Sequence, residues 1–461
     1  MSYLDEIRLL EESDKRYIWH PFTQMKDWTG EKPVIIAEGR GCFLKDVHGK
    51  WYLDGVSSLW VNIHGHRKQE IDNAIREQLD KIAHSTLLGL ANIPAIKLAE
   101  RLIGLTDKSF PGLTPRLSKV FYSDNGSTAV EVALKMAYQY WLHKGVSGRN
   151  SFLSLKNGYH GDTLGAVSVG GIEIFHSTFS PLLFKTHKAS SPYCYRCGFS
   201  KTFPECSLAC LKEMEEILKN HSPEIAAVVI EPLVQAAGGM IIWPEGYLKG
   251  VRELCNAYDV LLIADEVATG FGRTGKMFAC AHESIVPDIM CLSKGITNGY
   301  LPLAVTLTTD NVYNAFLGEF RDLKTFFHGH SYTGNPLACA AALACLEIFE
   351  QENTLQHMEQ KSALLADKLR DISGLLHAGD ARSIGLMAAI ELVEDKSSKR
   401  AYPWEEKMGW KVAFNARETG VLIRPLGNVI VIMPPLGIRD DDLNLLMDLI
   451  KKSIITATER K

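Results

Sequence analysis

A lysine in the second half of the sequence has the surroundings that a nucleophilic amine needs. Lys294 follows the apolar run 289–292, which is typical of a short buried strand, and glycines follow it at 295 and 299. A lysine at the end of such a strand leaves the apolar layer and enters the space beyond it. Desolvation there lowers the pKa of the amine and favours Schiff-base chemistry. A lysine that begins a solvated turn would show the same pattern, so Lys294 indicates a site only together with other residues.

Two carboxylates follow another apolar run. Asp265 and Glu266 come directly after 260–264, at the carboxyl end of a predicted strand, where open α/β sheets bind ligands. A buried aspartate is rare unless it is paired. Asp265 could therefore meet a metal, an arginine or a protonated ring nitrogen. A helix cap or an exposed turn explains the same pattern equally well.

The glycine-rich segment 270–276 matches two phosphate-binding motifs incompletely. It fits both the dinucleotide fingerprint Gly-x-Gly-x-x-Gly and the phosphate loop Gly-x-x-x-x-Gly-Lys. Met277 stands where a phosphate loop needs the Ser or Thr that holds magnesium, which argues against an NTPase. The first glycine does not follow the strand immediately, which argues against a dinucleotide fold. The remaining interpretation is a loop that covers a cavity.

Further polar residues follow other predicted strands. Residues 123–128 precede an amphipathic helix, and the free N–H groups of a helix N-terminus form a seat for phosphate, although most such sequences are only caps. Tyr159 follows the next strand and could either stack on a planar ligand or pack in a loop. Glu231 and Gln235 follow another strand end.

Metal binding is a weaker interpretation of the histidines and cysteines. His328 and His330 could be ligands, but no matching carboxylate or cysteine set stands nearby, so a turn is favoured and no metal is expected in the catalytic site. Four cysteines resemble a zinc knuckle, although the second pair has an unusual spacing, and zinc, a disulfide and free thiols all stay open. These cysteines are Cys194, Cys197, Cys206 and Cys210.

The composition is that of an ordinary globular protein. The 461 residues are 46% hydrophobic and 23% charged, which allows two domains with a large core. The net charge of −4 gives no support to nucleic-acid binding. No apolar run approaches a membrane span, and no secretory signal pattern precedes the ten cysteines. A cytoplasmic protein with reduced thiols is expected.

The order of the predicted elements indicates an α/β fold. Strands alternate with helices between about 86 and 343, which predicts a mostly parallel sheet covered on both faces. After about 344, a helix over 351–372 and strands over 383–392 and 429–433 predict a smaller α+β domain. The strands of the large sheet are expected at 119–122, 151–155, 226–230, 260–264, 289–292 and 303–308.

The predicted elements divide the chain into domains and indicate where its polar residues come together. Residues 1–85 are expected to form the N-terminal segment of the small domain, 86–343 the large domain, and 344–461 the C-terminal part of the small domain. The carboxyl ends of parallel strands open on one crevice. The sequence therefore predicts that Ser127, Tyr159, Glu231, Asp265 and Lys294 lie together.

The motifs taken together resemble a known family. The run Ile-Ala-Asp-Glu-Val-Ala-Thr-Gly-Phe-Gly-Arg-Thr-Gly from Ile263, followed by Lys294, resembles the class III aminotransferases of fold type I, over nearly the whole chain. The resemblance implies pyridoxal 5′-phosphate as cofactor and excludes the dinucleotide interpretation. Segments 19–23, 57–60, 159–163, 334–339 and 424–427 are most similar to the 7,8-diaminopelargonic acid aminotransferases of biotin synthesis. The implied reaction converts 8-amino-7-oxononanoate to 7,8-diaminononanoate.

The resemblance also implies a role for individual residues. Lys294 would bind the cofactor and move a proton, and Asp265 would keep the pyridine nitrogen protonated. A homodimer with shared active sites is implied, in which the partner supplies part of the phosphate seat. The expected cofactor contacts are Gly126, Ser127, Tyr159, Gln235, Val267, His330 and Ser331. The expected substrate contacts are Phe22, Leu59, Trp60, Tyr159, Gly329 and Arg424, the last as a clamp for a carboxylate.

The amino donor and several alternatives stay open. Phe22, Leu59 and Val431 stand where many members that use S-adenosylmethionine have a tyrosine, a tryptophan and an aromatic residue, so L-lysine is an equal candidate as donor. By resemblance all three positions face the substrate pocket. The alternatives are another class III enzyme, such as an ω-amino acid:pyruvate aminotransferase or an aminomutase, a non-catalytic cofactor-binding regulator, and a dinucleotide oxidoreductase.

Overall fold

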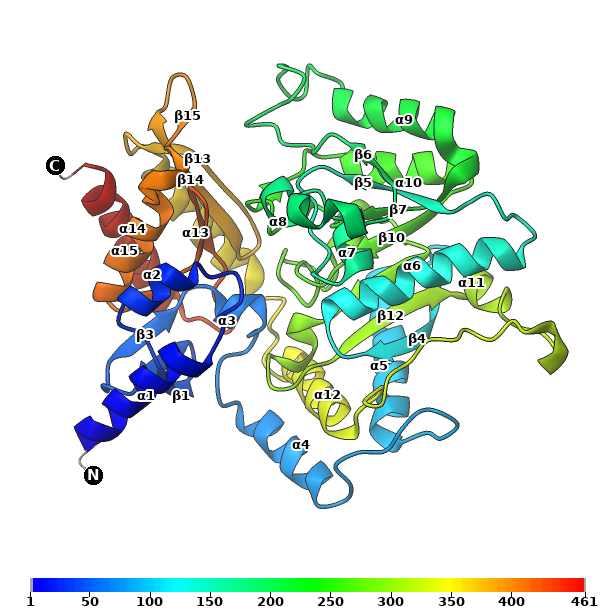
Figure 1. Ribbon diagram of the computed structural model, residues 1–461, viewed down its shortest axis with the longest axis horizontal. Helices are drawn as coiled ribbons and strands as arrows, with labels where there is room; N and C mark the ends of the chain where they lie inside the picture. The colour runs from blue at the N-terminus through cyan, green and yellow to red at the C-terminus, as the bar shows by residue number, and fades with distance from the viewer. Residues whose placement is uncertain (1–2, 460–461) are drawn as a thin grey trace.

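A seven-stranded sheet forms the centre of the larger part of the molecule (Figure 1), whose computed structural model describes residues 3–459. The strand order is β4-β12-β11-β10-β7-β5-β6. Only β12 runs antiparallel to its neighbours, so the predicted mostly parallel sheet is confirmed. The strands are β4 Leu117–Ser123, β5 Ser151–Leu155, β6 Thr186–Ala189, β7 Ile225–Ile230, β10 Leu261–Asp265, β11 Ile289–Leu292 and β12 Ala304–Thr309.

Helices cover both faces of this sheet and surround the smaller part (Figure 1). The first half of the chain contributes α1 Tyr3–Tyr17, α2 Met25–Gly30, α3 Ser57–Trp60, α4 Gln69–Leu79, α5 Ile93–Ser109, α6 Gly126–His143, α7 Leu164–Val169, α8 Glu173–His176 and α9 Ala209–His221. The second half contributes α10 Tyr247–Ala257, α11 Asp310–Asn314, α12 Pro336–Gln351, α13 Met358–Ser373, α14 Met408–Glu418 and α15 Asp440–Thr458.

Alternate residues of the central strands point to opposite faces and create two hydrophobic clusters. In β10, Leu261 and Ile263 pack with the apolar side of α6, whereas Leu262 and Ala264 belong to the main core on the other face. Helix α6 also donates a hydrogen bond to the sheet, from the indole N–H of Trp141 to a carbonyl oxygen of β7 at 2.8 Å. This hydrogen bond joins the last turns of α6 to the start of β7.

The smaller part is built from both ends of the chain. One sheet has the order β1-β2-β3-β16, and β16 pairs in parallel with β3, so that Val421 lies opposite Leu53. A second sheet has the order β13-β14-β18-β17, with β15 paired to β14. The strands are β1 Ile36–Arg40, β2 Phe43–Asp46, β3 Trp51–Asp54, β13 Ala378–Ile384, β14 Met387–Asp395, β15 Arg400–Ala401, β16 Val421–Leu422, β17 Pro425–Leu426 and β18 Val429–Ile432.

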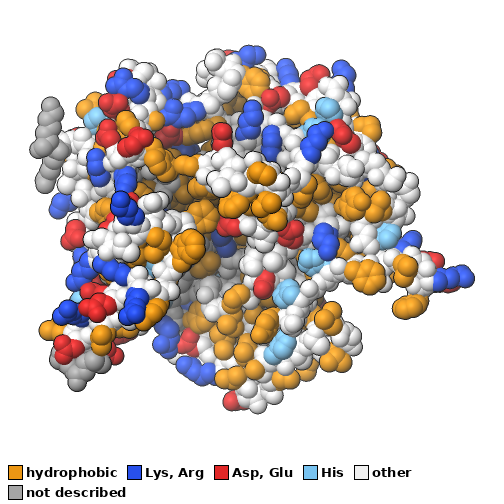
Figure 2. Space-filling view, viewed as in Figure 1, with side chains coloured by type: hydrophobic (Ala, Val, Ile, Leu, Met, Phe, Trp, Pro, Cys, Tyr) orange, Lys and Arg blue, Asp and Glu red, His pale blue; other side chains and the backbone are white. Residues whose placement is uncertain are grey.

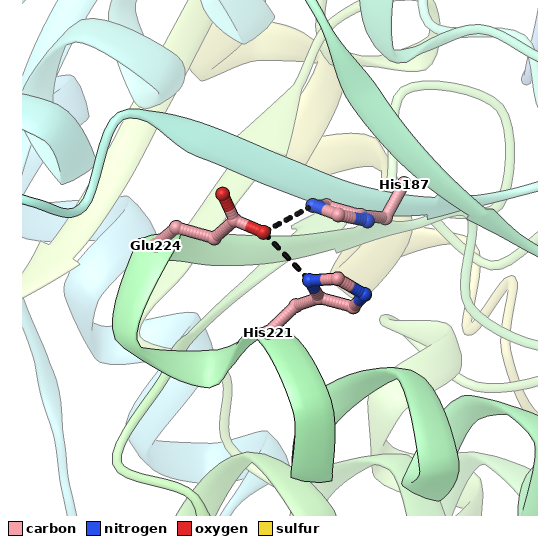
Figure 3. A group of neighbouring side chains, drawn as sticks. All are labelled: His187, His221 and Glu224. Carbon is pink, nitrogen blue, oxygen red and sulfur yellow. Dashed lines mark hydrogen bonds and ion pairs between the residues drawn. The ribbon is translucent and has the colours of Figure 1, made fainter.

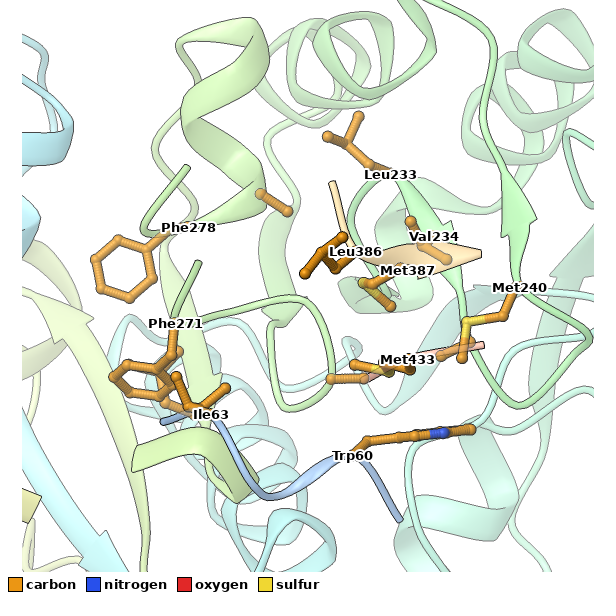
Figure 4. Packing of buried hydrophobic residues seen from close by; sticks show 14 of the residues in the cluster. Trp60, Ile63, Leu233, Val234, Met240, Phe271, Phe278, Leu386, Met387 and Met433 are labelled. Atoms are coloured by element: carbon orange, nitrogen blue, oxygen red, sulfur yellow. The ribbon is translucent and has the colours of Figure 1, made fainter. Parts of the chain in front are cut away.

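One hydrophobic core joins the two parts. Figure 4 shows Trp60 from the N-terminal region, Met240 and Phe271 from loops beside the large sheet, and Met387 and Met433 from the C-terminal region in the same cluster. This shared core fixes the position of the smaller part against the carboxyl ends of the central strands. Within residues 3–459, the helices are all too short or too polar to span a membrane.

Two predictions for the C-terminal region are wrong. A helix over 351–372 was expected, but α12 ends at Gln351 and α13 begins at Met358, because Asn353 has a positive φ of 47° that breaks the helix. A single strand over 383–392 was expected, but Gly385, with a φ of 58°, forms a turn between β13 and β14. The division into domains at 85 and 343 stays a prediction.

Candidate active site

A cavity of about 660 Å³ lies at the carboxyl ends of the central strands. Figure 2 shows that the surface is hollowed between the two parts, with hydrophobic side chains around the hollow. Residues that follow β4, β5, β7, β10 and β11 line the cavity, as expected from the sheet topology. They include Gly126, Ser127, Tyr159, Glu231, Asp265 and Lys294.

Lys294 lies at the floor of this cavity. It begins a short 3-10 helix after β11, with a positive φ of 45°, and its Nζ lies 4.9 Å from the centre of the Trp60 ring. Burial lowers the pKa of the amine, while the charges of Asp265 and Glu231 oppose this shift. The lowered pKa makes the amine a better nucleophile at neutral pH than an exposed lysine.

Asp265 ends β10 and is held by two hydrogen bonds. Its Oδ2 lies 2.8 Å from Nδ1 of His160, and its Oδ1 accepts the backbone N–H of Val267 at 3.1 Å. Both Asp265 and His160 are buried. With the proton on Nδ1, His160 donates to the carboxylate and fixes its orientation. The sequence placed His160 next to Tyr159 but gave no sign of this pairing, which depends on how β5 and β10 are aligned on the two sides of β7.

Glu231 is a second buried carboxyl group beside Asp265. It accepts the backbone N–H groups of Tyr159 and Ala236, each at 2.9 Å, and so fixes the loop that carries the tyrosine. Burial, and then the charge of Asp265, raise the pKa of Glu231 to about 8. The strand-end position of Glu231 was noticed in the sequence, but its support of Tyr159 was not.

The start of α6 offers backbone N–H groups to the cavity. Asn125 caps the helix by accepting the N–H of Thr128 at 3.0 Å, and Ser127 lies 2.7 Å from Thr163 through their hydroxyl oxygens. A Cβ on Gly126 would lie 2.6 Å from Cγ1 of Val267, so only glycine allows this close approach. The positive end of an eighteen-residue helix, opened by glycine, suits a phosphate.

Trp60 reaches the cavity through an unusual turn. All four residues of α3 have positive φ values, from 49° to 71°, which costs roughly 1–2 kcal/mol for each non-glycine residue. Hydrogen bonds hold the turn in place: Ser57 donates to the Met433 carbonyl at 2.6 Å, and the Ser58 hydroxyl donates to Asp54 at 2.8 Å. The turn places the indole ring of Trp60 beside Lys294.

Arg273 stabilises the same turn through hydrogen bonds. The guanidinium group is buried and donates to the carbonyl oxygens of Pro434 at 2.7 Å, Asn62 at 2.8 Å and Trp60 at 3.3 Å. Burial lowers its pKa to about 9. The arginine of the glycine-rich segment therefore joins the large sheet to both ends of the chain.

Four predicted contacts are not among the residues that line the cavity. Gln235 is fully buried and donates to the Lys156 carbonyl at 2.8 Å, while the Ser191 hydroxyl donates to its Oε1. Arg424 donates to the Phe22 carbonyl at 3.0 Å, and burial lowers its pKa. Phe22 and Leu59 are each 54% exposed, so they are free to contact a ligand.

Other predicted contacts lie further away. Gly329, His330 and Ser331 belong to the segment between α11 and α12, which extends from the body at the right of Figure 1 and does not line the cavity of its own chain. Val431 is buried in β18 opposite Ala389 and also lies outside the cavity. Except for Gln235, the geometry thus brings together the predicted cofactor residues that follow the central strands, but not those of the extended segment.

The chain is similar to known proteins over nearly its whole length. The family model of class III aminotransferases matches residues 25–454. An adenosylmethionine-8-amino-7-oxononanoate aminotransferase of Geobacter sulfurreducens is 55% identical over 98% of this chain and 99% of its own. An enzyme of the same name from Aquifex aeolicus is 53% identical over 97% of each chain.

Solved structures extend the likeness to the fold. An adenosylmethionine-8-amino-7-oxononanoate aminotransferase from Methanocaldococcus jannaschii superposes with a TM-score of 0.92 at 49% identity, covering 97% of this chain and 99% of that one. An amine transaminase from an uncultivated Pseudomonas species, in its PLP-bound form, superposes with a TM-score of 0.89 at 38% identity. The match covers 96% of this chain and 98% of that one. The chain therefore belongs to the class III aminotransferase family, whose members depend on pyridoxal 5′-phosphate.

Proposed function

We propose that this aminotransferase transfers an amino group to 8-amino-7-oxononanoate, forming 7,8-diaminononanoate in biotin synthesis. The observation that carries the proposal is the match, over 97% or more of the chain, to several proteins named as aminotransferases of this substrate. These relatives are named with adenosylmethionine, which favours S-adenosylmethionine over L-lysine as the amino donor. A cytoplasmic location is inferred from the ten cysteines, none of which forms a disulfide within residues 3–459.

The residues of the cavity fit pyridoxal 5′-phosphate. Gly126 has no side chain and so leaves room for a phosphate, and the N-terminus of α6 offers backbone N–H groups to bind it. The buried carboxylate of Asp265 suits a protonated ring nitrogen, and Lys294 suits covalent attachment. When bound, the cofactor supplies an electron sink for the carbon that gains or loses the amino group.

Each residue then has a defined task. Lys294 would hold the cofactor covalently and would move a proton at its Nζ, a task that the lowered pKa of its amine favours. Asp265, oriented by His160, holds the proton on the ring nitrogen through a hydrogen bond worth about 1.5–3 kcal/mol. Tyr159 and Val267, which both line the cavity, would contact the two faces of the ring. The role proposed for Gln235, contact with the ring hydroxyl, requires its amide to exchange one of its present partners.

The substrate is proposed to lie against Trp60 and Arg424. The guanidinium group would exchange the Phe22 carbonyl for the substrate carboxylate, a charge-assisted hydrogen bond that is stronger than the one it replaces. Phe22, Leu59 and Trp60 would cover the apolar chain of the substrate and exclude water from the reacting atoms.

A homodimer is proposed to complete the site. The segment between α11 and α12 exposes large apolar side chains, with Phe320 98% and Phe327 74% exposed, which a second subunit would cover. It would carry Gly329, His330 and Ser331 into the partner's cavity.

The dimer is tested by mixing inactive variants. Ser331→Asp places a carboxylate at the proposed phosphate seat, and Lys294→Ala removes the amine. If the sites are shared, refolded mixtures contain some complete sites and regain about a quarter of wild-type activity. If each chain carries its whole site, the mixture stays inactive. Light scattering on the wild type measures the subunit number independently.

The reaction is tested by absorbance of the cofactor-loaded enzyme. Addition of S-adenosylmethionine should bleach the yellow colour, and 8-amino-7-oxononanoate should restore it. If only L-lysine bleaches the colour, L-lysine is the amino donor and the assignment of S-adenosylmethionine is wrong. Bleaching only by an ω-amino acid would favour the ω-transaminases, a rival supported by solved structures of that name at 31–35% identity. Yellow protein that no donor bleaches would support a non-catalytic regulator.

A further inference from the structure

A compact group of metal-binding side chains lies at the edge of the large sheet, away from the cavity. His187 is on the edge strand β6, His221 is the last residue of α9, and Glu224 ends the 3-10 helix that leads into β7. Figure 3 shows two imidazole rings that both face one carboxylate oxygen of Glu224. None of the three residues lines the catalytic cavity.

The distances are those of ligands to a single ion. Oε1 of Glu224 lies 3.3 Å from Nε2 of His187 and 2.7 Å from Nδ1 of His221, and the ring centres are 4.5 Å apart. In tetrahedral zinc sites, bonds of about 2.0–2.1 Å place neighbouring ligand atoms about 3.3 Å apart. The Glu224–His187 pair already has this separation, and the Glu224–His221 pair, which is hydrogen-bonded at 2.7 Å, would open toward it when an ion enters. Within residues 3–459, no other three Cys, His, Asp or Glu side chains have ligand atoms so close together.

His187 supplies a separate reason to expect a ligand. Its Nε2 is shielded from solvent and has no hydrogen-bond partner of acceptable geometry, although it faces the carboxylate. A shielded nitrogen without a partner is uncommon in folded proteins. The side chain of His221 is 44% exposed, so an ion and a water molecule have access from solvent.

We propose that His187, His221 and Glu224 bind one Zn²⁺ ion, with water as the fourth ligand. Two imidazole nitrogens and a carboxylate oxygen form a donor set that zinc commonly takes. The ion would join the edge strand β6 to the end of α9 and to the turn before β7. Its role is structural, since it would hold an exposed sheet edge whose hydrogen bonds are otherwise made on one side only.

The four cysteines of the neighbouring segment are a different candidate for zinc. Burial, followed by the nearby Cys206 and Cys197, raises the pKa of Cys194, and burial also raises the pKa of Cys210, which lies near Cys194 and Cys206. No three of these sulfur atoms come within 4.8 Å of one another. The two histidines and Glu224 are therefore the group whose ligand atoms already lie close together. The experiment must distinguish zinc binding by this group from zinc binding by the cysteines.

Calorimetric titration of the chelator-treated, cofactor-loaded enzyme with Zn²⁺ tests the site. We expect one ion per chain and a rise in the thermal midpoint. His221→Gln and Glu224→Gln, which keep a polar side chain, should each weaken binding at least tenfold. His357→Ala, at an exposed histidine far along the sequence, should bind as the wild type does.

Cobalt substitution identifies the ligand atoms. Co²⁺ bound by His187, His221 and Glu224 gives no thiolate charge-transfer band. Absence of Zn²⁺ binding by the wild type, or unchanged binding by both glutamine variants, would overturn the proposal. A strong thiolate band that Cys194→Ser removes would assign the metal to the cysteines instead.

Discussion

The close approach of helix α6 to the loop after β10 makes Gly126→Ala an informative substitution. The new Cβ would lie 2.6 Å from Cγ1 and 3.0 Å from Cγ2 of Val267. Carbon atoms in contact are normally about 3.5–4.0 Å apart, so the helix start and Val267 must separate by about 1 Å. Both residues line the cavity, and the N–H groups proposed to hold the phosphate would move with the helix.

The size of the effect follows from the overlap. Overpacking of this kind costs about 1–3 kcal/mol. We expect this cost to appear in cofactor binding. The helix N-terminus can shift away from Val267 in the apoenzyme, whereas the bound phosphate requires the helix N-terminus in its original position. The Kd for pyridoxal 5′-phosphate should therefore rise about 5- to 150-fold.

Reconstitution of the apoenzyme, followed by absorbance, measures this Kd. Val267→Ala removes both γ carbons, so Gly126→Ala with Val267→Ala should bind the cofactor more tightly than Gly126→Ala alone. Gly104→Ala, in α5 with no atom within 4 Å of the new Cβ, is the matched control and should leave the Kd unchanged. Wild-type affinity in Gly126→Ala, or no recovery in the double variant, would refute the steric explanation.

Three further substitutions test other contacts. Trp141→Phe leaves a carbonyl of β7 without its donor at 2.8 Å, and urea unfolding should show about 1–3 kcal/mol lower stability. Arg273→Lys cannot reach both the Asn62 and Pro434 carbonyls, so we expect a loss of about 2–4 kcal/mol in the same assay and a lower kcat/KM. Burial, and then the neighbouring aspartate, raise the pKa of Glu231 from 4.5 to about 8, so the wild type loses stability as pH rises through this range. The thermal midpoint of Glu231→Gln relative to the wild type should rise between pH 5 and pH 8, and parallel profiles would contradict the raised pKa.

The sequence predicts the central sheet well because its strands are continuous apolar runs. The six expected strands all occur, and the rule that parallel strand ends share one edge correctly brings Ser127, Tyr159, Asp265 and Lys294 to one cavity. Strand β6 was missed because Thr-His-Lys-Ala is too polar to show a buried pattern. Edge strands bury fewer side chains and so leave a weaker signal.

Contacts between distant segments could not be predicted in the same way. The pairing of His160 with Asp265 and the support of Tyr159 by Glu231 arise from the register of strands, which no local pattern encodes. The left-handed turn before Val61 contains no glycine, so its sequence gives no sign of positive φ values. Hydrogen bonds to Asp54, Arg273 and Met433 hold the turn, and two of these partners are distant in the sequence.

The pairing of β3 with β16 has a consequence for how the protein is made. About 370 residues separate the paired positions Leu53 and Val421, and all seven strands of the large sheet leave the ribosome between them. The nascent chain can therefore fold the sheet that carries Lys294 first, because its contacts are nearer in sequence. The turn at Trp60, which rests on the Met433 carbonyl through Ser57, acquires its support only when translation is almost complete. An incomplete chain thus has its reactive amine before it has the surfaces that confine a substrate.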